Sequence, residues 1–333
     1  MNEIITYIFR KPDPKYKSIE GLFNVIAINL KGDVVTKRIQ MAFSGGGLKT
    51  ICNNLTNFKK QANQLYHITG DVHYMALKTG SKTVLTIHDV QSILKTSFIK
   101  GLYLKLFWFW LPAFCVSRIT VISEFTKKEL SIIIPFAKRK VRVVHNPVNP
   151  KFQPNAYQFN KVKPTLLLIG TKPNKNLERT IQALETINCK VIIIGKLLDA
   201  QVNLLDKLNI NYVNKFDLSF DDLYAQYRTC DLVCFASTYE GFGMPIIEAQ
   251  AIGRPVISSN LGAMKEVAQE SACLVDPYKV HAIREGILKL INNDQYREDL
   301  ISKGFVNIER FQTAKIAHEY LQVYKEILKN NGN

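Results

Sequence analysis

The stretch Ser237-Thr-Tyr-Glu-Gly-Phe-Gly-Met-Pro-Ile-Ile-Glu-Ala249 joins an apolar run of strand length, residues 231–236, to a segment of helical composition, Met244–Ile252. Gly241 and Gly243 supply the tight turn, and Pro245 stands where the first turn of a helix tolerates proline. The order strand, glycine loop, helix is typical of a parallel α/β sheet. It also places the first helical amide groups above the end of the strand, which favours a bound anion or a cluster of hydroxyl groups.

Two carboxylates accompany this loop, Glu240 within it and Glu248 in the predicted helix. A carboxylate accepts hydrogen bonds without donating, which suits paired hydroxyl groups such as a ribose diol. The pair therefore indicates a phosphate that is attached to sugars. The alternative interpretation is a Glu that stabilises the helix dipole and a second Glu on the surface. A dinucleotide fingerprint does not fit, because Ile246 occupies the position of its third glycine.

The whole chain repeats this alternation of strands and helices in two series, which predicts two doubly wound, Rossmann-like α/β domains facing a central cleft. The boundary is marked by a cluster of prolines, which neither helices nor inner strands tolerate: Pro147, Pro150, Pro154 and Pro164. We expect domains over residues 1–150 and 151–333. A last helix from Thr313, with Ile316, Tyr320, Tyr324 and Ile327 on one face, is predicted at the C-terminus.

In the first half, polar residues follow the predicted strands at their carboxyl ends, where ligands of such sheets collect. His88 and Asp89 form the most prominent pair, and His67 and His73 are weaker candidates because a single histidine is more often structural. The glycine run at residues 44–47 fits either a phosphate cradle or a flexible turn.

In the second half, Lys172 and Lys175 lie in the turn after the predicted strand Thr165–Ile169. They are placed to bind a diphosphate at the same sheet edge as the Glu240 loop, and Asn176 is predicted to cap the next helix. The alternative is a pair of solvated loop lysines.

The net charge of +16 is unevenly distributed. Residues 1–150 carry 22 Lys and Arg against 8 Asp and Glu, a net charge of +14, whereas residues 151–333 carry 22 against 20, a net charge of +2. This asymmetry indicates an anionic partner for the first half. The aromatic segment at residues 97–115, with Lys100 and Lys105, fits either a core helix or a helix at an anionic membrane surface. The six cysteines lack metal or disulfide spacing, and no signal peptide is evident, so we expect a cytoplasmic protein.

Taken together, these motifs resemble glycosyltransferase family 4 (group 1), the retaining nucleotide-sugar glycosyltransferases of the GT-B fold. The resemblance covers the whole chain and is strongest from Thr165 to Pro277. It rests on Gly-Thr-Lys-Pro-Asn-Lys-Asn-Leu-Glu178, on Glu240-Gly-Phe-Gly-Met-Pro-Ile-Ile-Glu-Ala249 and on Gly253-Arg-Pro-Val-Ile-Ser-Ser259. It implies a C-terminal helix that crosses back to the first domain. It also implies a nucleotide-sugar donor, a glycan or lipid-linked acceptor in surface polysaccharide synthesis, and no metal or other cofactor.

The resemblance also implies residue roles. Glu248 would hold the ribose, Lys175 would neutralise the diphosphate, and His88 would lie near the donor sugar and the acceptor. Catalytic roles fall to His88, Glu240 and Lys175. The residues implied in donor binding are Lys172, Lys175, Glu240, Gly241, Phe242, Gly243, Met244 and Glu248, and those on the acceptor side are His67, His73 and Asp89.

Two departures from the family pattern and two rival functions accompany this prediction. Thr171-Lys172 stands where the family usually has an arginine, and residues 10–17 replace a glycine pair after the first strand. An epimerase or phosphorylase of the same fold is an alternative enzyme. Nucleic-acid binding is suggested by charge alone, but the basic residues are scattered and match no nucleic-acid motif. We therefore expect no nucleic-acid partner.

Overall fold

A computed structural model describes residues 3–12, 18–94 and 97–330, so residues 13–17 of the basic loop after the first strand lie outside it. The chain forms two compact units: unit 1 comprises Met1–Pro147 with Thr313–Asn333, and unit 2 comprises Val148–Gln312. The last helix thus belongs to the unit formed by the N-terminal half.

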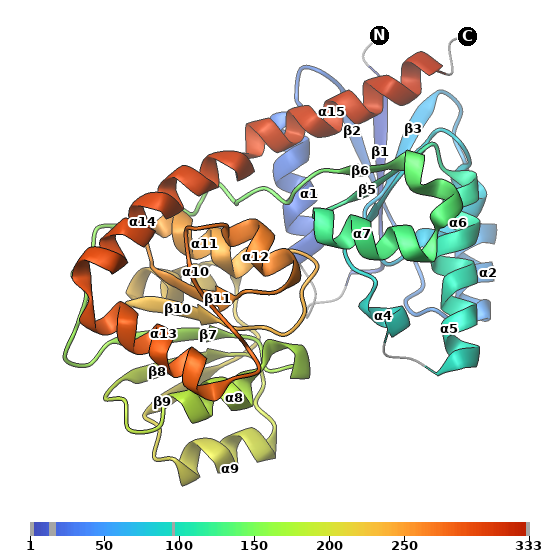
Figure 1. Cartoon of the computed structure of the whole chain (residues 1–333). Coiled ribbons are helices and arrows are strands. Elements are labelled where there is room, and N and C mark those ends of the chain that lie inside the picture. The colour runs from blue at the N-terminus through green and yellow to red at the C-terminus, as the bar shows by residue number, and fades with distance from the viewer. Residues whose placement is uncertain (1–2, 13–17, 95–96, 331–333) are drawn as a thin grey trace. The chain divides into compact units, whose positions relative to one another are not determined.

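Unit 1 is built on a parallel sheet with the strand order β2-β1-β3-β4-β5-β6 and helices on both faces (Figure 1). Its strands are β1 (Ile4–Phe9), β2 (Val35–Gln40), β3 (Gln64–Ile68), β4 (Thr83–Ile87), β5 (Arg118–Val121) and β6 (Val141–Val143). Its helices and helical turns are α1 (Ser18–Asn29), α2 (Leu48–Asn57), η1 (His73–Met75), α3 (Ala76–Thr79), α4 (Gln91–Leu94), α5 (Phe98–Leu104), η2 (Lys105–Trp110), α6 (Leu111–Cys115), α7 (Glu124–Ile133), η3 (Pro135–Lys140) and α15 (Thr313–Asn330).

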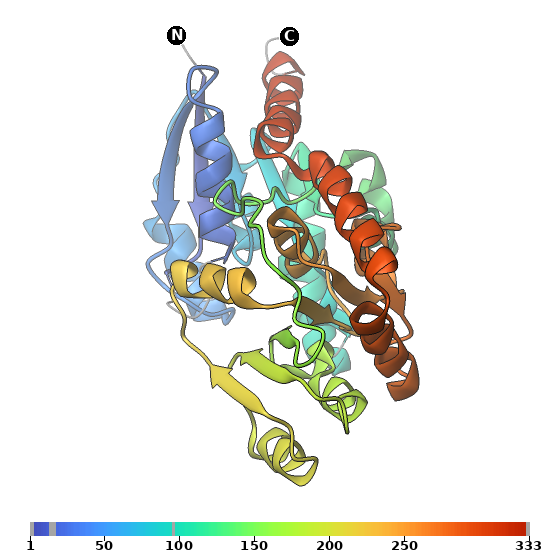
Figure 2. The ribbon, with the colours of Figure 1, turned by 90° about the vertical axis from the view of Figure 1, so that its left-hand side faces the viewer.

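The C-terminal helix α15 packs on the sheet of unit 1 beside α1 (Figure 2). Its predicted apolar face is confirmed, since Ile316, Tyr320, Tyr324 and Ile327 are all buried. The hydroxyl group of Tyr324 lies 2.7 Å from Nδ1 of His67 on β3, which adds a polar contact to this apolar interface. Burial of this face attaches the end of the chain to its beginning.

Unit 2 has a second parallel sheet, with the strand order β12-β11-β10-β7-β8-β9. Its strands are β7 (Thr165–Ile169), β8 (Lys190–Ile194), β9 (Tyr212–Lys215), β10 (Leu232–Phe235), β11 (Val256–Ser259) and β12 (Cys273–Val275). Its helices and helical turns are η4 (Pro173–Lys175), α8 (Leu177–Ala183), α9 (Asp199–Lys207), α10 (Phe220–Thr229), α11 (Met244–Ile252), α12 (Gly262–Ala268), α13 (Val280–Asn292), α14 (Asp294–Ile308) and η5 (Glu309–Phe311).

The helix α11 covers the residues that the sequence predicts. It is apolar on nearly every side and correspondingly buried, with the half-buried Met244 and Glu248 as exceptions. It begins after Gly243, which has a φ of 117°, and ends at Gly253, which has a φ of 83°. Both conformations favour glycine, so the two glycines set the length of the helix.

Each parallel sheet has a topological switch point. At this point the chain leaves two neighbouring strands towards opposite sides of the sheet. In unit 2 this point lies between β7 and β10, and in unit 1 it lies between β1 and β3. Loops that follow such strands diverge at their carboxyl ends, which is where open α/β sheets bind ligands. In this fold, ligands are therefore expected at the loops after β7 and β10, and at those after β1 and β3.

The aromatic segment at residues 97–115 is partly core and partly surface. Phe109 and Ala113 are buried in the core of unit 1, whereas Ile99 is 82% exposed and Phe114 is 64% exposed. Within the described residues, no helix has both the length and the apolar composition needed to cross a bilayer.

Candidate functional site

The two loops at the switch point of unit 2 are tied together by hydrogen bonds. The amide group of Thr238 donates to the carbonyl oxygen of Asn174 at 2.8 Å. In return, Nδ2 of Asn174 donates to the carbonyl oxygen of Tyr239 at 3.0 Å. The turn after β7 and the loop after β10 therefore form one structure, and side chains from both strands meet there.

Lys175 and Glu240 form an ion pair at this point. Nζ of Lys175 lies 2.7 Å from Oε1 of Glu240, with the two side chains only 21% and 16% exposed. Nζ also lies 4.8 Å from the centre of the Phe235 ring, which favours a cation. Asn174 completes the arrangement, because its Nδ2 lies 3.3 Å from the same Glu240 oxygen. The structure thus brings together two residues that the sequence predicts as catalytic.

Gly170 makes room for the Lys175 side chain. This residue has a φ of 95°, and a Cβ atom built on it would lie 2.7 Å from Cγ of Lys175 and 2.9 Å from Cδ and Cε. Any larger residue would displace the lysine stem and would also be strained in this conformation. The first residue of the turn therefore sets the position of the cation.

The second predicted carboxylate, Glu248, is held by a tyrosine. The hydroxyl group of Tyr227 on α10 donates to Oε2 of Glu248 on α11 at 2.5 Å. Burial raises the pKa of Glu248 to about 7, while this hydrogen bond and the charge of Lys175 act in the opposite direction. A half-buried carboxylate that is only partly ionised at neutral pH is costly to retain, which is typical of functional sites.

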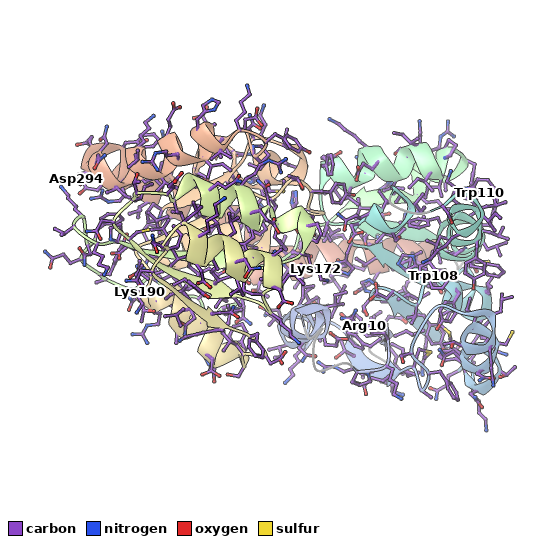
Figure 3. The ribbon with its side chains drawn as sticks, turned by 90° about the horizontal axis from the view of Figure 1, so that it is seen from below. Arg10, Trp108, Trp110, Lys172, Lys190 and Asp294 are labelled. Atoms are coloured by element: carbon purple, nitrogen blue, oxygen red, sulfur yellow. The ribbon has the colours of Figure 1, made fainter. Side chains whose placement is uncertain are left out.

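The other residues of the turn have structural roles or lie in solvent. Asn176 is buried, and its Nδ2 donates to the carbonyl oxygens of Ala236 at 3.0 Å and Pro277 at 2.6 Å. The predicted side-chain cap at Asn176 is wrong, because this residue takes a left-handed conformation and cross-links three loops instead. Lys172 is exposed at the start of η4 (Figure 3).

The aromatic side chain of the glycine loop, Phe242, is buried. Phe242 is 3% exposed, and its ring lies 5.5 Å from that of Phe311 in an edge-on contact. The Phe242 side chain therefore belongs to the core of unit 2. Met244 begins the helix and is half-buried.

Unit 1 has a pocket of about 460 Å³ at its own switch point. It is lined by polar and aromatic residues, namely Arg10, Lys11, Phe43, Ser44, Gly45, Gly46, Asp71, Val72, His73, His88, Asp89, Ser92, Leu104, Trp108 and Phe109. Arg10 forms an ion pair with Asp71, and Nε1 of Trp108 donates to the carbonyl oxygen of Asp71 at 3.0 Å. These contacts link Arg10 and Trp108, both labelled in Figure 3, through Asp71 in one wall of the pocket.

Two of the three candidate histidines line this pocket. Nε2 of His88 donates to the carbonyl oxygen of Thr69 at 2.7 Å, so Nδ1 is the nitrogen that can accept a hydrogen bond. Nδ1 of His73 donates to the carbonyl oxygen of Trp108 at 2.7 Å. Burial lowers the pKa of both rings, which favours neutral imidazoles at neutral pH.

His67 is not part of the pocket. It is fully buried, with Nδ1 2.7 Å from the hydroxyl group of Tyr324 and Nε2 2.7 Å from that of Thr86. Burial lowers its pKa to about 3. The structure therefore gives His67 a role in attaching α15 to the sheet, in place of the expected position on the acceptor side.

The glycine run at residues 44–47 is shaped by an aromatic neighbour. A Cβ atom on Gly46 would lie 2.8 Å from the Trp108 ring, and the hydroxyl group of Tyr103 donates to the carbonyl oxygen of Gly46 at 2.7 Å. Gly46 therefore permits close packing of the indole against the backbone, next to the pocket.

Comparison with known proteins identifies the family of this chain. The family model for glycosyl transferases group 1 matches residues 151–306, which cover most of unit 2. The model for glycosyltransferase family 4 matches residues 64–152. The chain belongs to the group 1 glycosyltransferases.

Relatives of this glycosyltransferase support the same conclusion. An uncharacterised glycosyltransferase of Methanocaldococcus jannaschii is 28% identical over 250 residues, which cover 73% of this chain and 68% of the relative. The O-antigen chain mannosyltransferase B of Escherichia coli is 34% identical over 116 residues, which cover 35% of this chain and 29% of the relative.

Solved structures show that the fold of this glycosyltransferase is GT-B. Sucrose-phosphate synthase from Thermosynechococcus elongatus matches with a TM-score of 0.81 at 15% identity, over 98% of this chain and 100% of that one. The HepE protein of Anabaena, in complex with UDP and glucose, matches with a TM-score of 0.79 at 15% identity, over 96% and 99%.

Sequence reasoning missed the residues that hold the predicted site residues in place. Asn174 supports Glu240, Tyr227 supports Glu248, and Gly170 accommodates Lys175. Asn174 and Gly170 lie within the motif around Lys175, so the sequence could have identified them as neighbours of the site. Tyr227 lies on a separate helix, and nothing in the sequence links it to Glu248.

Proposed function

We propose that this glycosyltransferase moves a sugar from a nucleotide-sugar donor to a glycan or lipid-linked acceptor, with retention of the anomeric configuration. The supporting observation is the ion pair between Lys175 and Glu240 at the switch point of unit 2, with Glu248 close enough for the Lys175 charge to lower its pKa. A nucleotide sugar has the complementary groups, namely a diphosphate, sugar hydroxyl groups and a ribose diol. The O-antigen mannosyltransferase and the UDP complex of HepE support this choice, and the former favours surface polysaccharide or glycoconjugate synthesis.

In the proposed reaction, the bond from the anomeric carbon to the donor phosphate breaks and a bond to the acceptor oxygen forms. The nucleoside diphosphate leaves with the bonding electron pair, and its phosphate takes the proton of the acceptor hydroxyl group. Lys175 and Lys172 stabilise the negative charge that develops on the diphosphate, so we propose neither a metal nor another cofactor. The ion pair between Lys175 and Glu240 is replaced by contacts to the phosphate and to the sugar hydroxyl groups.

We assign the acceptor to the pocket of unit 1. His73, Asp89 and Ser92 supply polar groups, and Trp108 supplies a broad apolar surface. The His88 ring is held by Thr69 with Nε2 protonated, which leaves Nδ1 to accept a hydrogen bond from a sugar hydroxyl group. The expected result of His88→Gln is lower transfer with unchanged donor affinity.

A nucleotide-sugar panel tests the proposal. UDP-glucose, UDP-N-acetylglucosamine, GDP-mannose and GDP are added to the purified chain, and the thermal midpoint is measured, because a ligand of the folded state raises it. One or more of them should raise the midpoint of the wild type and of Glu298→Ala, an exposed change on α14, but not that of Glu248→Ala. No shift with any nucleotide would contradict the proposal.

The reaction type is then read from the product. Proton NMR of the anomeric centre should show the configuration of the donor, and an inverted centre would exclude retention. Incubation with the donor alone separates transfer from epimerisation, because an epimerase converts the donor without an acceptor.

We further propose that unit 1 touches an anionic membrane surface from the cytoplasmic side. The continuous helical segment formed by α5, η2 and α6 exposes Ile99, Leu102, Leu106 and Phe114, and the Phe114 ring stacks on Phe136 at 4.3 Å. Exposed apolar side chains next to lysines are typical of helices that lie in a membrane interface.

Vesicle sedimentation tests this contact. Phosphatidylcholine vesicles that contain phosphatidylglycerol should carry the protein down at low salt, and vesicles of phosphatidylcholine alone should carry down less. The double change Lys100→Glu with Lys105→Glu should weaken the binding, whereas Lys190→Glu in unit 2 should not. Equal sedimentation with and without phosphatidylglycerol would contradict an anionic surface as the partner.

A further inference from the structure

The carboxylate of Glu248 is not free to rotate. One of its oxygens, Oε2, accepts the hydrogen bond from the Tyr227 hydroxyl group at 2.5 Å. Glu248 lies on α11 and Tyr227 on α10, so the contact joins two helices of unit 2. With Oε2 engaged, Oε1 is the oxygen that can accept a hydrogen bond from a ligand.

Tyr227 is itself rigidly placed. Its side chain is fully buried, and its ring meets the ring of Phe152 edge-on, with the centroids 5.3 Å apart. Burial raises the pKa of its hydroxyl group well above 10, so the group keeps its proton and acts as a donor at neutral pH. A buried tyrosine whose hydroxyl group reaches a carboxylate is a fixed hydrogen-bond donor.

We propose that Tyr227 is a positioning residue for the donor: its hydroxyl group orients the Glu248 carboxylate so that Oε1 accepts a hydrogen bond from the ribose of the nucleotide. This inference rests on the proposed function, because it assigns a partner to the residue that would bind the ribose. It goes beyond that function by naming the group that orients Glu248 for ribose binding.

The same contact adjusts the ionisation of Glu248. Burial raises the pKa of this carboxyl group to about 7, and the groups that act against burial are the Tyr227 hydroxyl on α10 and the Lys175 charge on η4. Loss of the hydroxyl group therefore raises the pKa further. At pH 7 a smaller fraction of Glu248 would then be ionised, and the ribose would meet a weaker acceptor.

The test is Tyr227→Phe, which removes one oxygen and keeps the ring against Phe152. Binding of UDP and GDP is measured by calorimetry between pH 6 and pH 9. We expect about tenfold weaker binding at pH 7, as for loss of one charge-assisted hydrogen bond. The pH midpoint of the affinity should move upward, with partial recovery at pH 9. Turnover at saturating donor should change little, because the effect is on binding.

Tyr224→Phe is the matched control. Tyr224 lies on the same helix and its ring meets the same Phe152, with the centroids 5.4 Å apart. This variant should bind the nucleotide with the wild-type affinity and pH midpoint. If Tyr227→Phe shows the wild-type pH midpoint and affinity, the inference is overturned. A uniform loss at every pH would overturn it too, since that is the result of a purely structural role.

A double variant separates this inference from the proposed function. In a Glu248→Gln background the group that titrates is absent, so Tyr227→Phe should no longer shift any pH midpoint. If neither UDP nor GDP binds the wild type, the proposed function fails. If one of them binds and Tyr227→Phe moves the midpoint as much without the Glu248 carboxylate as with it, the positioning role fails and the function stands.

Discussion

Glu248→Gln should stabilise the glycosyltransferase at neutral and alkaline pH while it weakens donor binding. Burial holds the pKa of Glu248 at about 7 in the folded protein, against an ordinary value of 4.5. Because the folded pKa is raised, the contribution of this carboxyl group to stability is fully present below pH 4.5 and is lost as the pH rises through 7. Glutamine has nearly the same shape, accepts from Tyr227 and does not ionise.

The size of the effect follows from the pKa difference. A difference of about 2.5 pK units is equivalent to about 3.4 kcal/mol, so the stabilisation should grow from about 1 kcal/mol at pH 5.5 to about 3 kcal/mol at pH 8. These are upper values, since the carboxylate is half-buried and solvent reduces the effect. The stabilisation of the variant thus increases by about 2 kcal/mol between pH 5.5 and pH 8. For a unit of this size, the thermal midpoint of the variant should rise relative to that of the wild type by about 4 to 8 °C over the same range.

Differential scanning calorimetry of the wild type and Glu248→Gln across this pH range measures the difference directly. Glu298→Gln, at an exposed position on α14, is the control and should show no pH-dependent difference from the wild type. A difference for Glu248→Gln that does not change with pH, or that turns against the variant as the pH rises, would refute the reasoning.

Three further results are expected. Gly170→Ala should weaken nucleotide binding about tenfold, because the new Cβ atom meets the Lys175 side chain. It should also destabilise unit 2 by about 1 kcal/mol, because the φ of 95° favours glycine. Unchanged affinity in calorimetry would show that the lysine stem does not need this space. The NMR signals of His67 should not titrate above pH 5, because burial lowers its pKa to about 3, and a midpoint near 6.5 would contradict its burial. Tyr324→Phe should lower the free energy of unfolding of unit 1 by about 1 kcal/mol in urea without affecting nucleotide binding, since it removes a buried hydrogen bond to His67.

The sheet strands and the α11 helix could be predicted because their signals are local. A continuous apolar run such as Thr165–Ile169 identifies a buried strand, and glycines before and after Met244–Ile252 identify the ends of a helix. The proximity of Lys175 and Glu240 could be predicted for a related reason. Both residues follow strands of one sheet, and parallel strands end at the same edge.

Other features depend on tertiary contacts that no local pattern shows. Tyr227 lies in a helix between Gln226 and Arg228, and its contact with Glu248 is visible only in the packed structure. His67 has the same local signal as His88, a histidine near the end of a strand, but α15 covers it from the other end of the chain. A histidine can therefore be placed at a sheet edge from sequence, whereas its exposure depends on what packs against it.

The most direct test of the proposed donor site compares a lysine that follows β7 with a lysine that begins the neighbouring strand β8. Lys175 lies in η4, beyond the carboxyl end of β7. Lys190, which is labelled in Figure 3, begins β8 and so lies at the amino end of the parallel strands. Calorimetry with the nucleotide that binds the wild type should give at least about tenfold weaker binding for Lys175→Ala, as expected for loss of a charged phosphate contact, and unchanged binding for Lys190→Ala. Unchanged binding in Lys175→Ala, or equal losses in both variants, would contradict the placement of the diphosphate.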